Sequence, residues 1–271
     1  MSTGPFAPHT SSPSASVLAS VRWTVHDSLV MARRGTYRYV RLPDWLFFST
    51  AQPVMFVLLF TYVFGGAIQV PTGKYIDFLL PGILVQTVIF GTSGTAVGLA
   101  EDISKGVFDR YRSLPMARSA VLAGRILADT ANNVFVIALM ITVGLVIGFR
   151  FHGSPLAVIG VPLLTVAFAV PFQWIAAMIG TSVRSVEAAN LAGFVWMFPL
   201  TFVSSAFVPV ETMPGWLQPI AQANPFSVAV DAVRALALGL DATTAVLKTL
   251  AWAVVLTAVF APLAIARYRR A

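Results

Sequence analysis

The sequence of 271 residues contains no cysteine and few charged residues. Without cysteine, the chain has no disulfide, no cysteine-ligated metal site and no cysteine nucleophile. Charged residues make up 11% of the chain, whereas a soluble domain usually carries about 25%. Because a soluble surface needs charges, this shortage and the 57% of hydrophobic residues predict an integral membrane protein.

The sequence also lacks a phosphate-binding GxxxxGK[ST] motif and any cluster of metal-ligating residues. We therefore expect no catalytic residue, no metal site and no cofactor in this chain. The formal net charge is +7, but the basic residues are few and lie between apolar blocks. This placement indicates membrane topology rather than binding to nucleic acid.

Six stretches are long and apolar enough to cross a bilayer. They are residues 45–67, 78–100, 130–149, 155–183, 188–208 and 249–266. We expect an all-α integral membrane fold with six transmembrane helices within residues 43–271. None of the stretches contains Asp, Glu, Lys or Arg, which argues against transport coupled to protons or ions, because such transport needs ionisable groups in the bilayer.

The placement of lysine and arginine predicts the orientation of the chain. Fourteen of the 18 basic residues precede the first stretch, follow the second or fourth, or end the chain. Basic residues gather on the cytoplasmic side of membrane proteins. We therefore expect a multi-pass protein of the cell membrane with both termini in the cytoplasm.

Two segments precede the first apolar stretch. Residues 1–15 are rich in Pro, Ser and Ala and are expected to form a disordered tail. Within residues 16–42, Leu18, Val21 and Val25 recur at helical spacing. This pattern predicts a cytoplasmic amphipathic helix on the lipid bilayer, although a helix packed on its own protein would show the same pattern.

The segment 206–248, between the fifth and sixth stretches, is expected on the external side. It is apolar but interrupted by prolines. Asn224–Pro225 is typical of a helix start, and Gly239 of a helix end. Asp231 and Arg234 would then face each other on that helix. We expect a re-entrant helical hairpin before the last span.

The tetrapeptide Gly91-Thr92-Ser93-Gly94 is similar to the GxSG motif of intramembrane serine proteases. Such an enzyme needs a histidine base beside the serine. The histidines are His9, His26 and His152, and none lies in an apolar stretch. Close packing of helices through Gly94 and Gly98 is the simpler interpretation.

The loop 101–129, between the second and third stretches, mixes acidic with basic residues. The positive-inside rule explains the basic residues but not the acidic ones. Aromatic and arginine side chains are usual anchors of protein interfaces, so the loop suits a partner-docking surface.

At this loop the chain resembles the permeases of the ABC-2 exporter family, specifically the daunorubicin-resistance group. The matching residues are Asp102, Gly106, Asp109, Arg110, Arg112, Ser113, Leu114, Pro115, Gly124 and Arg125. Further similar runs are Phe64-Gly65-Gly66-Ala67, Leu80-Pro81-Gly82, Phe207-Val208-Pro209, Met213-Pro214-Gly215-Trp216-Leu217 and Asn224-Pro225-Phe226.

The resemblance implies a permease subunit that exports a hydrophobic drug, antibiotic or lipid. A separate cytoplasmic ABC ATPase would bind ATP and Mg, and a second permease copy or a related permease would complete the membrane part. The residues implied to couple to the ATPase are Glu101, Asp102, Gly106, Asp109, Arg110, Arg112, Ser113, Leu114, Pro115, Arg118 and Arg125. Those implied in the external hairpin are Pro209, Met213, Pro214, Trp216, Asn224 and Pro225.

Aromatic side chains of the second and fifth stretches are candidates for a substrate path. They are Phe90, Phe194, Trp196, Phe198 and Phe202. Aromatic surface suits permissive binding of apolar cargo, but each residue alone would also suit a lipid-facing or core position. The alternative functions are an ATP-independent secondary transporter and, with less support, the intramembrane protease.

Overall fold

The computed structural model describes residues 30, 32–33, 43–70, 73–107 and 118–270. Over these residues the chain forms helices, turns and loops and no strand. The helices are α2 (Pro43–Leu59), η1 (Phe60–Phe64), α3 (Tyr75–Gly91), α4 (Ser93–Ser104), α6 (Arg118–Ile147), α7 (Pro155–Gly180), α8 (Val186–Phe202), η2 (Val210–Thr212), α9 (Gln218–Ala223), α10 (Pro225–Leu238) and α11 (Thr243–Arg270).

Four helical segments are long and apolar enough to cross a membrane. They are Tyr75–Ser104, Leu122–Ile147, Pro155–Gly180 and Thr243–Tyr268. Two shorter apolar helices, Thr50–Phe64 and Val186–Phe202, correspond to the first and fifth predicted stretches. Over its described residues the chain is thus an all-helical, multi-pass membrane protein, and its four long helices agree with four of the predicted spans.

The second predicted span is a pair of helices, α3 and α4, joined at Thr92. The Thr92 hydroxyl donates to the Ile89 carbonyl at 2.7 Å. Every residue of α3 from Tyr75 to Ile89 is buried. A helix that is apolar all round belongs in the interior, and α3 is indeed packed by α2, α6, α7 and α10.

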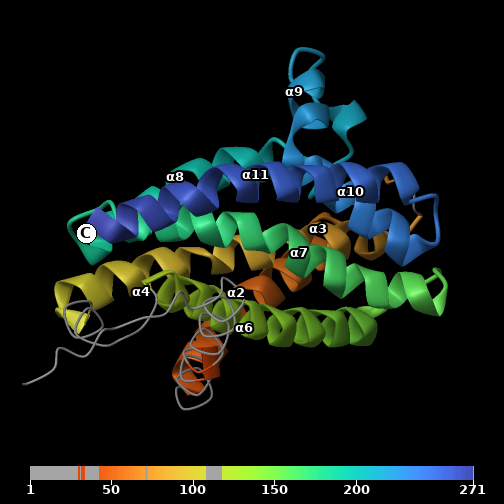
Figure 1. Ribbon diagram of the computed structural model, residues 1–271. Helices are drawn as coiled ribbons and strands as arrows, with labels where there is room; N and C mark the ends of the chain where they lie inside the picture. Colours follow the sequence, from red (N-terminus) through yellow and green to blue (C-terminus); the bar gives the residue numbers. More distant parts are fainter. Residues whose placement is uncertain (1–29, 31, 34–42, 71–72, 108–117, 271) are drawn as a thin grey trace, which may run out of the picture.

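The last helix, α11, packs along α7 and exposes much of its remaining surface. At one end of the bundle, Leu99 of α4, Leu122 of α6 and Ala177 of α7 pack with Ala264 and Tyr268 of α11. The end of α4 and the carboxyl end of α11 therefore lie together (Figure 1). We call this the inner end.

Helix α10 lies at the opposite end, which we call the outer end, beside α3, α7 and α11 (Figure 1). The backbone N–H of His152, in the loop between α6 and α7, donates to the Ala237 carbonyl at 2.9 Å. Helix α9 and η2 project from the bundle near this end (Figure 1).

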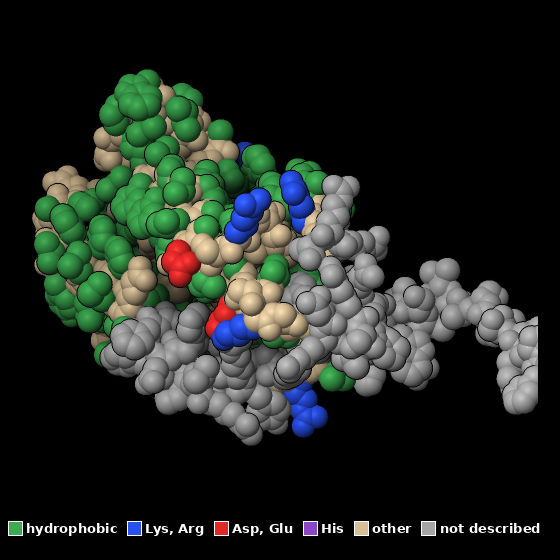
Figure 2. Space-filling view, turned by 90° about the vertical axis from the view of Figure 1, so that its left-hand side faces the viewer, with side chains coloured by type: hydrophobic (Ala, Val, Ile, Leu, Met, Phe, Trp, Pro, Cys, Tyr) green, Lys and Arg blue, Asp and Glu red, His purple; other side chains and the backbone are tan. Residues whose placement is uncertain are grey.

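Charged side chains are visible at the inner end. Viewed from that end, Lys, Arg, Asp and Glu stand among apolar and neutral side chains (Figure 2). The expected tail, residues 1–15, lies outside the described residues. Of the expected interfacial segment 16–42, residues 30, 32 and 33 are described, and they are helical.

Candidate functional site

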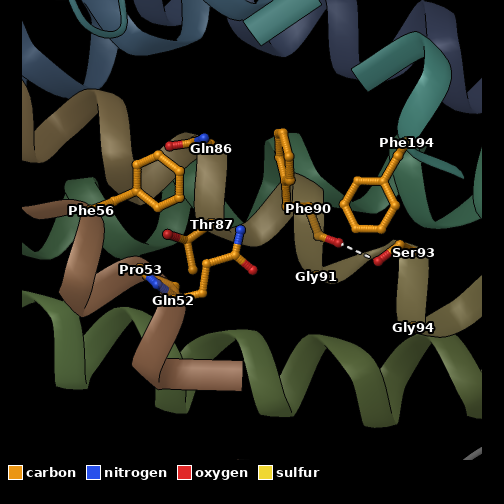
Figure 3. Close-up of a pocket in the computed structure, with 10 residues that line it drawn as sticks. All are labelled: Gln52, Pro53, Phe56, Gln86, Thr87, Phe90, Gly91, Ser93, Gly94 and Phe194. Atoms are coloured by element: carbon orange, nitrogen blue, oxygen red, sulfur yellow. Dashed lines mark hydrogen bonds between the residues drawn. The ribbon is translucent and has the colours of Figure 1, made fainter. Parts of the chain in front are cut away.

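A cavity of about 170 Å³ lies between α2, α3, α4 and α8 (Figure 3). Its lining consists of Gln52, Pro53, Phe56, Gln86, Thr87, Phe90, Gly91, Ser93, Gly94 and Phe194. Phe56 and Phe194 lie on opposite sides of it, with Phe90 of α3 between them (Figure 3). All of its lining residues are uncharged, so the cavity suits an apolar body that carries neutral polar groups.

A second hollow of about 350 Å³ adjoins the first and shares Ser93 and Gly94 with it. Its other lining residues are Val97, Val186, Glu187 and Asn190. Glu187 lies in the first turn of α8, so this hollow extends toward the inner end. The two hollows together follow the contact between α4 and α8.

The Ser93 hydroxyl is engaged with the end of the preceding helix, α3, because it donates to the Phe90 carbonyl at 2.7 Å. His152 lies in the loop at the outer end, and His9 and His26 fall outside the described residues. This arrangement agrees with a packing role for the Gly91–Gly94 run.

The aromatic residues expected to contact cargo fall into two groups. Phe90 and Phe194 line the cavity. Phe198 lies edge-on to Phe90 at 5.4 Å between ring centroids, and Phe202 stacks on Phe198 at 5.9 Å. Trp196 instead stacks on Phe172 of α7 at 5.8 Å and is not among the lining residues.

The polar lining of the cavity was not predicted from the sequence. Gln52, Gln86 and Thr87 lie within apolar stretches of the sequence. A polar residue inside a predicted span is the sequence signal that could have identified them. Gln86 and Thr87 are buried. Polar side chains are energetically costly at membrane depth. On the cavity wall, these side chains can form hydrogen bonds with a polar group of a bound molecule.

A charged cluster links α4 to α6 at the inner end. The Arg125 guanidinium donates to the Gly94 carbonyl at 3.2 Å and lies 3.4 Å from the Asp102 carboxylate. Its Nε lies 3.5 Å from Asp129 Oδ2, and that oxygen accepts a hydrogen bond from Thr95 at 2.5 Å. The cluster therefore ties α4 to α6 near the connection between them. Residues 101–129 were predicted as a loop, but residues 101–104 belong to α4 and residues 118–129 to α6.

Gly98 makes this cluster possible. A Cβ at this position would lie 2.0 Å from Arg125 Nη2 and 2.7 Å from Cζ. The close neighbour at Gly98 is therefore an arginine side chain, whereas the Gly94–Gly98 pattern predicts close packing against another helix. Any larger residue would displace the guanidinium from α4.

The structure brings together two of the predicted coupling residues, Asp102 and Arg125. Glu101 pairs with Lys105 at 2.5 Å on the helix surface, and Gly106 takes a positive φ of 65° after the end of α4. Asp109, Arg110, Arg112, Ser113, Leu114 and Pro115 lie outside the described residues. Arg118 begins α6, and its side chain is likewise outside the description.

The predicted hairpin residues lie in and around η2, α9 and α10. Pro209 precedes η2, and Met213 and Pro214 follow it. Trp216 is 72% exposed beside α9. Asn224 starts α10 as predicted, because its side chain accepts from the Phe226 N–H at 2.9 Å, with Pro225 in the first turn. Gly239 ends the helix at φ 71°.

Comparison with known proteins identifies relatives over most of the chain. A profile of the ABC-2 type transporter family matches residues 27–238. A daunorubicin resistance ABC transporter permease protein from Streptomyces coeruleorubidus is 39% identical over 90% of this chain and 87% of its own length. A probable doxorubicin resistance ABC transporter permease protein from Mycobacterium tuberculosis is 30% identical over 93% of this chain and 91% of its own length. A putative transport permease from Cyanophora paradoxa is 24% identical over 78% of this chain and 73% of its own length.

Proposed function

We propose, since this chain belongs to the ABC-2 type transporter family, that it is the membrane permease subunit of an ATP-driven exporter of hydrophobic compounds. The observation that carries this proposal is the structure of α3 and α4. The middle of this helix pair lines an uncharged aromatic cavity, and the inner end of α4 carries the Asp102–Arg125 contact. Energy delivered to the inner end would thus reach the wall of the cavity.

The cargo we infer is a drug, an antibiotic or a lipid with a large apolar body. Two relatives are named for resistance to daunorubicin and doxorubicin. The aromatic and neutral polar lining of the cavity supports a cargo of this kind, because aromatic rings bind planar apolar surfaces and amides bind neutral polar groups.

The partner we infer is a cytoplasmic ABC ATPase that binds ATP and Mg, since the sequence carries no phosphate-binding loop of its own. The ATPase would dock at the loop 101–129, where acidic and basic residues alternate. Two permeases, either identical or related, would form the complete membrane part.

We further infer six spans with both termini in the cytoplasm. The two shorter helices, α2 with η1 and α8, would complete the four long spans. The placement of lysine and arginine supports this orientation, and so does the position of the carboxyl end of α11 beside the end of α4. The segment 206–248 would then form an external re-entrant hairpin.

Reconstitution into liposomes tests the function. We expect vesicles that contain the chain with the P-loop ATPase that copurifies with it to transport doxorubicin when Mg-ATP is added, and vesicles without the ATPase to transport none. Flux driven by a proton or sodium gradient in the absence of the ATPase would instead show a secondary transporter. Transport should survive Ser93→Ala, and its loss with a parallel loss of peptide cleavage would indicate a protease.

A further inference from the structure

A buried arginine joins the hairpin to the central helix at the outer end. Arg234 of α10 is 8% exposed. Its Nη1 donates to Asp231 Oδ1 at 2.9 Å, which is the pairing predicted from the sequence. Its Nε and Nη2 both donate to the Phe78 carbonyl of α3, at 3.1 and 3.0 Å, and Nη2 also donates to the Ser205 carbonyl at 2.8 Å. The guanidinium carbon lies 3.7 Å from the centre of the Phe78 ring.

The guanidinium is charged at neutral pH even though it is buried. Burial lowers the pKa of Arg234 to about 10, and Asp231 opposes this shift. Most of its hydrogen bonds go to carbonyl oxygens of two different segments. Water can replace a bond of this kind when the segments separate, so the contact can be broken and remade.

Residues 203–207, between α8 and η2, are the segment that Arg234 holds. The Ser205 N–H donates to Ser227 Oγ at 3.1 Å, and the Ser205 hydroxyl donates to Asp231 at 2.7 Å. The Tyr75 hydroxyl of α3 donates to the Phe207 carbonyl at 2.9 Å. A Cβ on Gly82 would lie 2.3 Å from the Ala206 carbonyl oxygen, so α3 and this segment are in backbone contact.

Phe207 connects the held segment to the cavity through a row of stacked rings. It lies 4.9 Å from Phe60 and 5.3 Å from Phe202, measured between ring centroids. Phe60 stacks on Phe56 at 5.8 Å. Through Phe198, Phe202 is linked to Phe90. Both ends of the row, Phe56 and Phe90, line the cavity. Phe207 lies in the middle of the row, on the outer side of the cavity.

A buried ionic contact is often no more stable than well-packed apolar side chains of the same volume, and its best-attested use is to fix one arrangement against another. The alternatives here are a segment attached to α3 and a segment detached from it. Helix α3 continues into α4, which carries the Asp102–Arg125 contact. A movement of α4 at the inner end would therefore be transmitted along α3 to its contact with Arg234.

We propose that Arg234 keeps closed the path by which cargo would leave the cavity at the outer end, the exit. It holds residues 203–207 against α3, and this contact opens during each transport cycle so that cargo passes Phe207. This proposal rests on the proposed export function. Arg234 acts here as a positioning residue, since it would not touch the cargo itself.

Cysteine labelling tests the proposal, because the native chain has no cysteine. Ser204→Cys places a thiol in the held segment at a residue that is 1% exposed, and Trp216→Cys places one at a residue that is 72% exposed. Each variant is expressed with its ATPase in cells, and a membrane-impermeant maleimide is added outside. We expect Trp216→Cys to be labelled in all conditions and Ser204→Cys to be protected when ATP turnover is blocked.

Turnover with Mg-ATP and cargo, or the added substitution Arg234→Met, should raise the labelling rate of Ser204→Cys by about tenfold or more. Arg234→Lys should give an intermediate rate, because lysine keeps the charge but offers one donor group. Protection of Ser204→Cys during active export would overturn the proposal, and this arm does not depend on how Arg234→Met folds. Absence of labelling at Trp216→Cys would contradict the external position of the hairpin and thus the proposed topology.

Discussion

At the scale of single residues, the informative side chains are the polar ones inside apolar helices. Hydropathy identifies the helices but does not distinguish a glutamine on a cavity wall from one in the core. Gln86 lines the cavity, whereas Gln173 of α7 is fully buried and receives a hydrogen bond from Thr130 at 3.2 Å. The residues predicted from the sequence therefore include Phe90 and Phe194 of the cavity wall but none of its polar side chains.

The cavity residues make the first prediction. Phe90→Ala and Phe194→Ala remove ring surface from the wall, so each should raise the apparent KM for doxorubicin about tenfold, equivalent to about 1.4 kcal/mol of binding. The kcat should change less than the KM. Phe135→Ala is the matched control, because Phe135 of α6 is 49% exposed and lies outside the cavity lining. An equal KM change in the control would remove the cavity from the cargo path.

Gly98 makes the second prediction. Gly98→Ala introduces a methyl group where the Arg125 guanidinium lies. The guanidinium should move and lose its contacts with Gly94 and Asp102, which should lower the free energy of unfolding by about 1–3 kcal/mol. Gly66→Ala is the control, because a Cβ at Gly66 meets no atom within 4 Å. Thermal unfolding in detergent measures both. Equal stability of the two variants would mean that the Arg125 contact with α4 is dispensable.

At the scale of elements, caps were predicted well and span lengths less well. Asn224, Pro225 and Gly239 set both ends of α10, because they act on local backbone groups. Length depends on tertiary contacts. The fifth predicted stretch extends to residue 208, but α8 ends at Phe202, three residues after Pro199, and its last carbonyls are capped by Asn224.

Asn224 therefore has two roles that one substitution series can separate. Its side-chain oxygen caps α10, and its amide donates to the Leu200 and Val203 carbonyls, both at 2.6 Å. Asn224→Ala should lower the free energy of unfolding by about 1–3 kcal/mol, because it removes both. Asn224→Asp keeps the acceptor but has no amide to donate, so a native-like stability in this variant would show that the α8 contact contributes little.

At the scale of the whole molecule, the proposed ATPase-docking surface and the proposed exit lie at opposite ends of one helical bundle. The α3–α4 pair connects them, since it touches the inner cluster, the cavity and the hairpin. Sequence composition was enough to predict the membrane class. It could not predict this connection, because contacts such as Arg234 with Phe78 join residues that are 156 positions apart.

The most direct test of the account is the amount of doxorubicin moved per ATP hydrolysed, measured in vesicles that contain the chain and its ATPase. Arg125→Met removes the link between α4 and α6, and Arg184→Met makes the same change at an exposed arginine before α8. We predict that Arg125→Met still supports ATP hydrolysis but moves roughly tenfold less cargo per ATP, a coupling loss of the usual size, while Arg184→Met behaves like the native chain. A native ratio of cargo to ATP in Arg125→Met would contradict the claim that energy reaches the cavity through this cluster.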